Sequence, residues 1–287
     1  MTEDILSQIH NRLPTLSKGQ RKIAEYILSS YEKAAFLTAL ALGKAVQVSE
    51  STVVRFAGEL GFDGYPQMQK AMQEMVRSRL TAVQRIEIST PSVAGNDLLS
   101  NVLQADMDRI RSSMELTDSQ AFTGAVNGLL NAKRIYVIGL RSSAALASFL
   151  SYYLNYIFED VRLITCGSES DIFDQVVHIR PSDAMIAISF PRYSTATVKA
   201  MHHAKTIGAS TIALTDGSAS PLCKPADYVL SARSDMLSFI DSLVAPMSLI
   251  NALLVALAGK REAELQNTLG QLETVWEQNH VYEKIYE

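Results

Sequence analysis

Apolar side chains in the first 78 residues recur only at helical spacing, three and four positions apart. Ser17 followed by Gln20 is typical of a helix capping box, in which each residue bonds the other's backbone. The apolar positions after it predict a helix over residues 18–30. No alternating β-branched run interrupts this region, so we expect a small all-helical domain over residues 1–78.

Two further helices in this region lie unusually close together along the chain. One is predicted over residues 37–45, and the next begins at Ser49 and ends before Gly61. Only residues 46–48 separate them. Two short helices joined by so tight a turn predict a helix-turn-helix motif, whose second helix enters the major groove of DNA.

The pattern changes after Lys133 to short runs that are apolar nearly throughout and alternate with helical segments. Such runs are typical of strands covered on both faces. Strands are predicted over residues 134–138, 161–165, 184–189, 210–215 and 227–231. Helices are predicted near residues 142–158, 195–207 and 236–258. The simplest architecture is an α/β domain with a five-stranded parallel sheet flanked by helices.

These patterns predict two domains with connecting segments. Residues 79–96 are polar and poorly patterned, which favours a linker, and residues 97–132 return to helical spacing. The predicted segments are a helix-turn-helix domain at 1–78, the linker at 79–96, connecting or dimerisation helices at 97–132, the α/β domain at 133–260 and a C-terminal helical extension at 261–287.

Composition narrows the function classes. The 287 residues carry a net charge of -4, so the chain lacks the overall basic excess of a non-specific nucleic-acid binder, and any DNA contact must be local. The longest apolar stretch, 249–258, is too short to span a bilayer, and we expect no membrane partner. Two cysteines and a polar, acidic start without a signal peptide predict a cytoplasmic protein.

The predicted recognition helix has a polar outer surface. Val48, Val53 and Phe56 can face inward, which leaves short hydroxyl side chains and one arginine outside. Such side chains reach phosphate oxygens and base edges of double-stranded operator DNA without blocking close approach. The candidate DNA-binding residues are Lys44, Gln47, Ser49, Glu50, Ser51, Thr52 and Arg55. Alternatively, Ser49 only caps the helix and Arg55 is a solvated charge.

Three segments of the N-terminal half resemble one known family. They are Lys22 to Leu28, Val48 to Phe56, and the Leu60-Gly61-Phe62-Asp63-Gly64-Tyr65 segment. They are similar to the N-terminal domain of RpiR (MurR/RpiR) transcriptional regulators. The resemblance implies a DNA-binding helix from Ser49 to about Leu60, a domain closed by the Gly61 to Tyr65 segment, and a C-terminal sugar isomerase (SIS) domain.

Two strand-to-helix turns of the predicted sheet are rich in small and hydroxyl residues. Because parallel strands gather ligands at their carboxyl ends, we expect the turns to lie together and to bind an anion through backbone N–H groups and hydroxyls. An arginine in each turn can also grip an oxyanion. The candidate residues are Gly139, Arg141, Ser142, Ser143, Ser189, Arg192, Ser194 and Thr195. The alternatives are that the serines are only helix caps and the arginines are solvated.

These turns also resemble the phosphosugar site of SIS domains, whose loops usually read Gly-x-Gly-x-Ser and Ser-x-Ser-Gly-x-Thr. The resemblance implies ligand-binding roles for Gly139, Ser143, Ser189 and Ser194. Two departures stand out, because Arg141 replaces the second glycine and Pro191-Arg192 replaces Ser-Gly. These replacements predict a bulkier and more cationic pocket, which favours a more acidic or differently shaped ligand.

The sequence therefore predicts a DNA-binding regulator of carbohydrate metabolism genes, modulated by a sugar phosphate or related anionic sugar, with no cofactor and no metal. Since the DNA-binding domain is close to neutral, a homodimer or homotetramer is expected, with two recognition helices about 34 Å apart. One alternative is a sugar phosphate isomerase, but the turns offer no Glu or His at a matching position as the general base. Another is a module that does not bind DNA.

Overall fold

The computed structural model describes residues 5–79, 81, 83–86, 97–165, 168–236 and 239–283. The chain divides into two compact units, Met1–Ser89 and Thr90–Glu287. Residues 80, 82 and 87–96 of the predicted linker lie outside the described residues.

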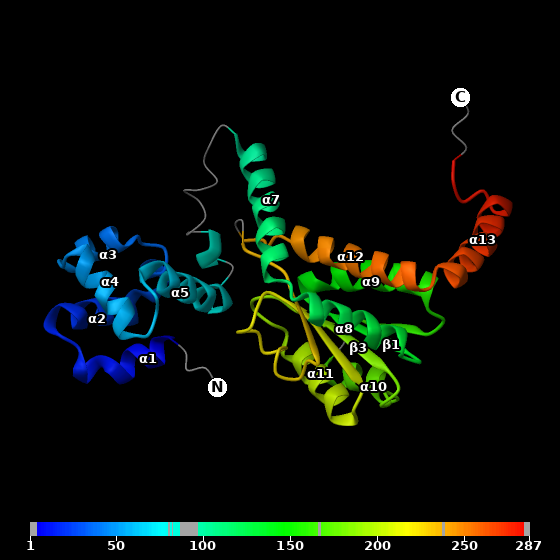
Figure 1. Cartoon of the computed structure of the whole chain (residues 1–287), viewed down its shortest axis with the longest axis horizontal. Helices are drawn as coiled ribbons and strands as arrows, with labels where there is room; N and C mark the ends of the chain where they lie inside the picture. Colours follow the sequence, from blue (N-terminus) through cyan, green and yellow to red (C-terminus); the bar gives the residue numbers. More distant parts are fainter. Residues whose placement is uncertain are drawn as a thin grey trace. The chain divides into compact units, whose positions relative to one another are not determined.

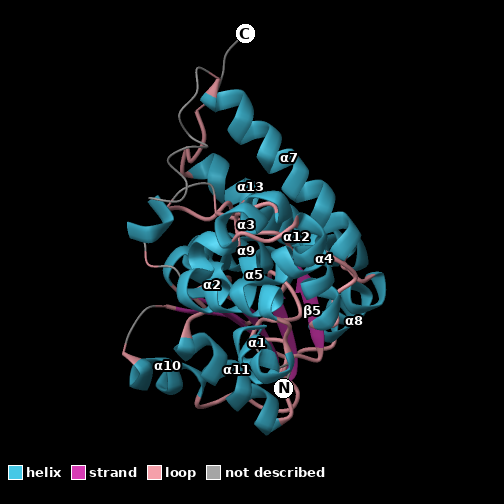
Figure 2. Cartoon of the chain, turned by 90° about the vertical axis from the view of Figure 1, so that its left-hand side faces the viewer, coloured by secondary structure: helices cyan, strands magenta, loops and turns pink. Residues whose placement is uncertain are grey.

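The described part of the N-terminal unit is helical (Figure 2). Its main helices are α1 (Ile5–Arg12), α2 (Lys18–Ala34), α3 (Ala39–Val46), α4 (Glu50–Glu59) and α5 (Tyr65–Arg79). The predicted capping box is present, because the Gln20 amide donates to Ser17 Oγ at 3.4 Å and the Ser17 amide donates to Gln20 Oε1 at 3.0 Å. α2 runs past the predicted end at Ser30, with non-helical backbone at that residue (φ -148°).

The C-terminal unit is built on a five-stranded parallel sheet, which confirms the predicted fold class (Figure 1). The strands are β1 (Ile135–Gly139), β2 (Val161–Ile164), β3 (Ala184–Ile188), β4 (Ser210–Thr215) and β5 (Tyr228–Ser231). Their order across the sheet is β2-β1-β3-β4-β5, and each neighbouring pair is parallel. Every residue of β1 and β3 is buried, which explains why these strands read as continuous apolar runs.

Helices cover both faces of the sheet. The helices are α7 (Leu98–Leu116), α8 (Ser119–Leu130), α9 (Ala144–Ile157), α10 (Glu169–Val176), α11 (Thr195–Ile207), α12 (Val244–Lys260) and α13 (Glu262–Gln278). α8, α9 and α12 pack on one face around Val137 and Ile186, whereas α10 and α11 pack on the other around Tyr136 and Met185. Residues that alternate along a strand thus supply two separate cores.

The structure differs from the predicted helices of the C-terminal unit at two places, the start of α12 and the helix α10. The helix expected over residues 236–258 begins only at Val244, and an isolated antiparallel bridge between Met236 and Asp241 occupies the preceding segment. Pro246 lies in the first turn of α12, where the lack of an N–H costs no helical hydrogen bond. Eight helical residues before Val244 would place Pro246 inside the helix, where it would break a backbone hydrogen bond and clash with the preceding turn. α10 was not predicted, although Ser168 and Asp171 form its capping box.

Within the described residues, no single helix is long and apolar enough to cross a membrane. α12 and α13 have the length and apolar composition of a membrane span only when taken together, and they are bent by 99° relative to each other.

Candidate DNA interface and anion-binding site

A close backbone crossing shapes the turn between α3 and α4. A β-carbon at Gly43 would lie 2.9 Å from the Val48 carbonyl oxygen, so only glycine lets the chain pass here. The Val48 amide donates to the Gly43 carbonyl at 2.9 Å. Gln47 ends α3 in the left-handed conformation (φ 58°), which turns the chain into Ser49, the N-cap of α4. The two helices are therefore held at a fixed mutual angle.

The outer surface of α4 agrees with the predicted recognition surface. Val53 and Phe56 are fully buried, and Val48 is partly buried. Of the predicted DNA-binding residues, Thr52 is half-buried and the others are exposed, namely Lys44, Gln47, Ser49, Glu50, Ser51 and Arg55. The structure thus leaves all but one of the predicted residues exposed, and their contact with DNA remains a prediction.

The hydroxyls at the start of α4 form a small network. Ser49 Oγ lies 2.9 Å from Ser51 Oγ and 2.8 Å from Thr52 Oγ1, and it accepts a hydrogen bond from the Thr52 amide at 3.3 Å. Arg55 Nε donates to the Ser51 carbonyl at 3.3 Å. Ser49 therefore does cap the helix. Because Ser49 and Ser51 remain exposed, capping does not remove their hydroxyls from a DNA partner.

α5 anchors the segment that leads into α3. The Tyr65 hydroxyl and the Gln69 side-chain amide both donate to the Leu37 carbonyl, each at 2.7 Å, and the Gln73 amide donates to the Ala35 carbonyl at 3.1 Å. Burial raises the pKa of Tyr65 to about 12. These bonds satisfy carbonyls that no helix uses, and they give the predicted closing segment a physical role in positioning α3.

A polar groove beside α4 was not predicted. It encloses about 900 Å³ and is lined by Arg12, Ser17, Gly19, Gln20, Thr52, Arg55, Gly58, Glu59 and Gly61. Arg12 Nη1 donates to the Glu59 carbonyl at 2.6 Å, which places a cation at the end of α4. Sequence reasoning missed Arg12 because it is distant in the chain from the motif, and only tertiary packing brings it there.

The strand order of the C-terminal unit places a topological switch point between β1 and β3. From β1 the chain passes to β2 on one side, and the next strand, β3, returns to the other side of β1. The helices that follow β1 and β3, α9 and α11, pack on opposite faces of the sheet. Gly139 pairs with Ile188 at the carboxyl ends of the two strands. Ligands of open α/β sheets bind at such a switch point, where the two predicted loops begin.

The first loop turns tightly over the end of β1. A β-carbon at Gly139 would lie 2.6 Å from the Ser143 carbonyl oxygen, so glycine is required there. The Ser143 amide donates to the Leu140 carbonyl at 3.2 Å, in a short 3-10 turn, Arg141–Ser143. Ser143 is buried and Ser142 exposed, and neither hydroxyl bonds another described residue or caps α9. The alternative that these serines are only caps thus loses support.

The second loop is held by its own serines and by the neighbouring turn. Ser189 Oγ accepts from the Ser194 amide at 3.1 Å, and Ser194 Oγ caps α11 by accepting from the Thr197 amide at 3.3 Å. The Tyr193 hydroxyl donates to the two carboxylate oxygens of Asp216, at 2.9 and 3.1 Å. Ser189 and Ser194 therefore have structural roles, and the turn after β4 supports the loop.

Accessibility differs among the predicted anion-binding residues. Gly139, Ser143 and Ser189 are buried, and Ser194 is half-buried. The exposed members are Arg141, Ser142, Arg192 and Thr195. The loops begin at paired strand ends, but ligand contact by any of these side chains stays a prediction.

Several groups that could act as a general base lie away from the two loops in the described part of the unit, but the Asp216 carboxylate, directly after β4, accepts from the Tyr193 hydroxyl of the second loop. Asp171 caps α10, with its carboxylate 2.6 Å from the Ser168 amide that donates to it. His178 and His202 are exposed, and His203 packs edge-on against Phe173 with ring centroids 5.9 Å apart. Among the described residues, no group of three or more His, Cys, Asp or Glu side chains could hold a metal ion.

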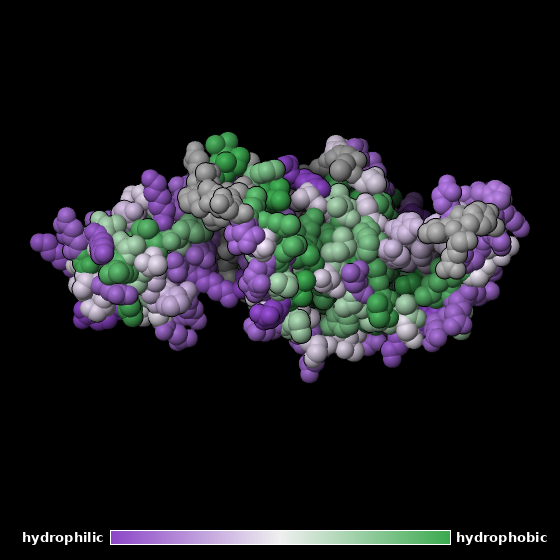
Figure 3. Space-filling model, turned by 90° about the horizontal axis from the view of Figure 1, so that it is seen from above, coloured by the Kyte–Doolittle hydropathy of each residue, from purple (hydrophilic) through white to green (hydrophobic). Residues whose placement is uncertain are grey.

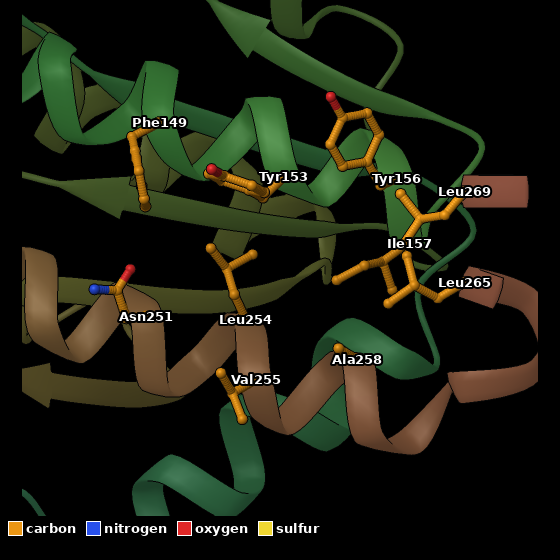
Figure 4. A pocket seen from close by; sticks show the side chains of 10 residues that line it. All are labelled: Phe149, Tyr153, Tyr156, Ile157, Asn251, Leu254, Val255, Ala258, Leu265 and Leu269. Atoms are coloured by element: carbon orange, nitrogen blue, oxygen red, sulfur yellow. The ribbon is translucent and has the colours of Figure 1, made fainter. Parts of the chain in front are cut away.

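A separate apolar cavity lies away from the strand ends, between α9, α12 and α13 (Figure 4). It encloses about 430 Å³, and its aromatic wall comes from Phe149, Tyr153 and Tyr156 of α9. The Tyr156 hydroxyl donates to Tyr152 at 2.6 Å, and this bond raises the pKa of Tyr156 to about 12. The cavity has few polar groups and is therefore ill suited to an anion.

A helix-turn-helix unit joined to an α/β unit with paired strand-end loops defines a class of proteins, the ligand-responsive DNA-binding regulators. Residues 3–78 match the helix-turn-helix domain of the RpiR family, and residues 128–256 match the SIS domain. The chain belongs to the RpiR family of transcriptional regulators, with the N-terminal helix-turn-helix domain and C-terminal SIS domain that the sequence predicted.

Relatives and solved structures agree with this assignment. The transcriptional regulator HexR of Pseudomonas aeruginosa is 27% identical over 94% of this chain and 94% of its own length. HexR of Escherichia coli is 26% identical over 93% and 92%. The sugar isomerase domain of an RpiR factor from Sphaerobacter thermophilus matches with a TM-score of 0.60 and 29% identity, covering 62% of this chain and 99% of its own.

A fourth match covers both units. The Vibrio vulnificus NanR protein, solved in complex with ManNAc-6P, has a TM-score of 0.60 and 21% identity over 95% of this chain and 97% of its own. At this identity the likeness concerns the fold.

Proposed function

We propose that this regulator binds operator DNA of carbohydrate metabolism genes and that a sugar phosphate or related anionic sugar, bound between the β1 and β3 loops, changes its operator affinity. The observation that carries the proposal is that one chain has both exposed hydroxyls on α4 and, at a sheet switch point, the Ser142 and Ser143 hydroxyls, which bond no other described residue. The protein then acts in the cytoplasm, where its operator and sugar phosphates occur.

The DNA half of the proposal rests on the chemistry of α4. Ser51 and Thr52 are short enough to let the helix backbone approach the groove, and Arg55 can reach a base edge or a phosphate. Arg12 adds a second cation on the wall of the polar groove. The amides at the start of α4 favour a phosphate because the helix dipole is positive there.

The ligand half rests on the first loop. Ser142 and Ser143 stand at the start of α9 with hydroxyls that bond no other described residue, and Gly139 lets the loop fold closely over the strand end. Hydroxyls and helix N–H groups in this arrangement suit a phosphate. NanR, which was solved with ManNAc-6P, shares the fold. The strand-end turns show no Glu or His among their described side chains, so we propose that the protein binds its ligand without converting it.

We further propose that the chain forms a homodimer or homotetramer through α7. One face of this helix buries Arg109 and Ser113 in the unit, whereas another is apolar and exposed. The exposed residues recur at helical spacing and are Leu99, Leu103, Met107 and Met114. Figure 3 looks onto this side and shows apolar side chains gathered over α7 and α12. A second copy fits this face, because a near-neutral DNA-binding unit needs a partner to hold two half-sites.

The DNA half is tested by selecting genomic fragments with the purified full-length protein and measuring affinity for the enriched site by fluorescence anisotropy. Arg55→Ala should weaken binding by about 10- to 100-fold, the effect of one lost base or phosphate contact. Lys70→Ala removes the same charge from an exposed position on α5 and should change affinity by less than about threefold. Equal effects of the two variants would mean that α4 does not read DNA.

The ligand half is tested by thermal shift and by anisotropy with a panel of sugar phosphates. A ligand that binds the folded protein raises its melting temperature and changes operator affinity. The same panel is assayed for aldose-ketose conversion without DNA. Turnover would favour an isomerase, and a panel without any effect on melting or DNA binding would reject the sugar-phosphate part.

A further inference from the structure

Two arginines in the loops after β1 and β3 hold an unusual backbone conformation. Arg141, in the loop after β1, has φ 58°, and Arg192, in the loop after β3, has φ 67°. This left-handed region is unfavourable for a residue with a β-carbon and is readily occupied by glycine. The same two positions carry glycine in the usual SIS pattern described above. The chain thus keeps a glycine-type backbone but places the longest cationic side chain on it, in both loops.

The surroundings hold these residues in place. Next to Arg192, the Tyr193 hydroxyl is bonded to Asp216 and the Ser194 amide to Ser189 Oγ. After Arg141, the Ser143 amide bonds the Leu140 carbonyl, and this closes the turn around it. An unfavourable conformation that its neighbours maintain points to a use for the side chain that glycine could not supply.

The two guanidinium groups are also available. Both arginines are exposed, and neither forms a hydrogen bond or an ion pair with another residue in the described part of the chain. They come from loops that start at paired positions, Gly139 and Ile188, on adjacent strands. Ser143 and Ser189, in the same two loops, are buried. Each loop therefore combines a buried serine with an exposed arginine near the paired strand ends.

We infer that Arg141 and Arg192 form a second anion subsite, so that the ligand carries another anionic group besides its phosphate, either a carboxylate or a second phosphate. This inference rests on the proposed function of the β1 and β3 loops. The hydroxyls and the α9 N-terminus suffice for one phosphate, whereas a planar guanidinium pairs in bidentate fashion with a carboxylate or phosphate. The ligand class is a phosphorylated sugar acid or a sugar bisphosphate rather than a neutral sugar monophosphate.

The test uses probes that share a carbon skeleton. Glucose 6-phosphate and 6-phosphogluconate differ in a carboxylate, and fructose 6-phosphate and fructose 1,6-bisphosphate differ in a phosphate. Calorimetry with the full-length protein should show that one two-anion probe binds at least about tenfold more tightly than its one-anion partner. The pair that shows the preference identifies the second group as a carboxylate or a phosphate.

Arg141→Gly and Arg192→Gly supply the matched variants. Each restores a residue suited to positive φ, so the melting temperature should stay the same or rise. Each variant should bind the preferred two-anion probe about 10- to 100-fold more weakly, the effect of losing a charged hydrogen bond. Its affinity for the one-anion probe should change by less than about threefold. Arg192→Lys keeps the charge without the planar fork and should give an intermediate loss.

The outcomes separate the two proposals. Equal binding of the one-anion and two-anion probes, unchanged by either glycine variant, overturns the second subsite and leaves the proposed regulator intact. A lower melting temperature in both variants, with all probes weakened alike, also overturns it, because the arginines would then be structural. Failure of every probe to bind the unaltered protein rejects the phosphosugar proposal, and this inference falls with it.

Discussion

Close backbone contact at two glycines determines the local geometry of both candidate sites. At Gly43 the β-carbon of any other residue would meet the Val48 carbonyl at 2.9 Å, and at Gly139 it would meet the Ser143 carbonyl at 2.6 Å. In each case the obstacle is backbone, which cannot rotate away as a side chain can. One glycine sets the turn before α4, the proposed recognition helix, and the other sets the loop after β1, where we propose anion binding.

Gly139→Ala should therefore destabilise the C-terminal unit by about 1–3 kcal/mol, the usual cost of forcing an added methyl group into a packed site. It should also lower the affinity for the ligand, because it displaces the loop that carries Ser142 and Ser143. Chemical denaturation and thermal shift measure the two effects. Gly259→Ala is the control, because a β-carbon there meets nothing within 4 Å, and it should stabilise α12 by about 0.5–1 kcal/mol. Equal stability of the two variants would contradict this account.

Tyr65 should make the N-terminal unit sensitive to alkaline pH. Burial raises its pKa to about 12, whereas a tyrosine in the unfolded chain ionises near about 10. The unfolded state therefore loses the proton first, and the contribution of neutral Tyr65 to stability, fully present below pH of about 10, is lost as pH rises toward 12.

Tyr65→Phe should cost about 1 kcal/mol at pH 8, because the hydrogen bond to the Leu37 carbonyl is lost. The difference in stability between the unaltered protein and this variant should shrink between pH 10 and pH of about 12, as the ionisable group is absent from the variant. Urea unfolding followed by circular dichroism measures it. A difference that stays constant over this range would show that Tyr65 titrates normally.

At the scale of elements, the periodic pattern of apolar residues was enough to predict a helix or strand wherever that element buries a continuous face. β1 and β3 are buried throughout, and α4 buries Val53 and Phe56 at helical spacing, so the sheet and the helix-turn-helix could be predicted. The short helix α10 and the starting residue of α12 were not predicted, because a local capping box determines the first and Pro246 the second. The groove at Arg12 could not be predicted from local pattern, since it depends on tertiary packing between α1 and α4.

The apolar face of α7 should mediate self-association. Leu103 is 54% exposed, and Leu103→Gln should raise the dimer dissociation constant by at least about tenfold, because an apolar side chain buried between copies contributes about 1.5–3 kcal/mol. Sedimentation equilibrium measures the constant. Val177→Gln makes a similar change at a 63% exposed position after α10 and should leave it unaltered. A monomeric unaltered protein, or equal effects of both variants, would remove α7 from the interface.

At the scale of the whole molecule, α7 is hydrogen-bonded to residues that lie between β5 and α12. The Arg233 amide, just after β5, donates to Ser113 Oγ at 2.8 Å, and the Ser242 hydroxyl donates to Asp106 Oδ1 at 2.6 Å. Both acceptors lie on α7. A ligand that shifts the strand-end loops can therefore bias α7 and, through the proposed dimer, the spacing of two recognition helices.

The proposed coupling between ligand and operator must act equally in both directions. A ligand that changes operator affinity by a given factor requires that operator DNA change ligand affinity by the same factor, which for allosteric proteins is typically about 5- to 150-fold. We expect calorimetric titration of the most strongly stabilising sugar phosphate, with and without saturating operator, to reproduce the factor found by anisotropy. Ser242→Ala removes the bond to Asp106, so it should reduce both factors together while leaving ligand affinity of the DNA-free protein within about threefold. If the factors stay unchanged in this variant, the signal does not pass through the Ser242 contact with α7.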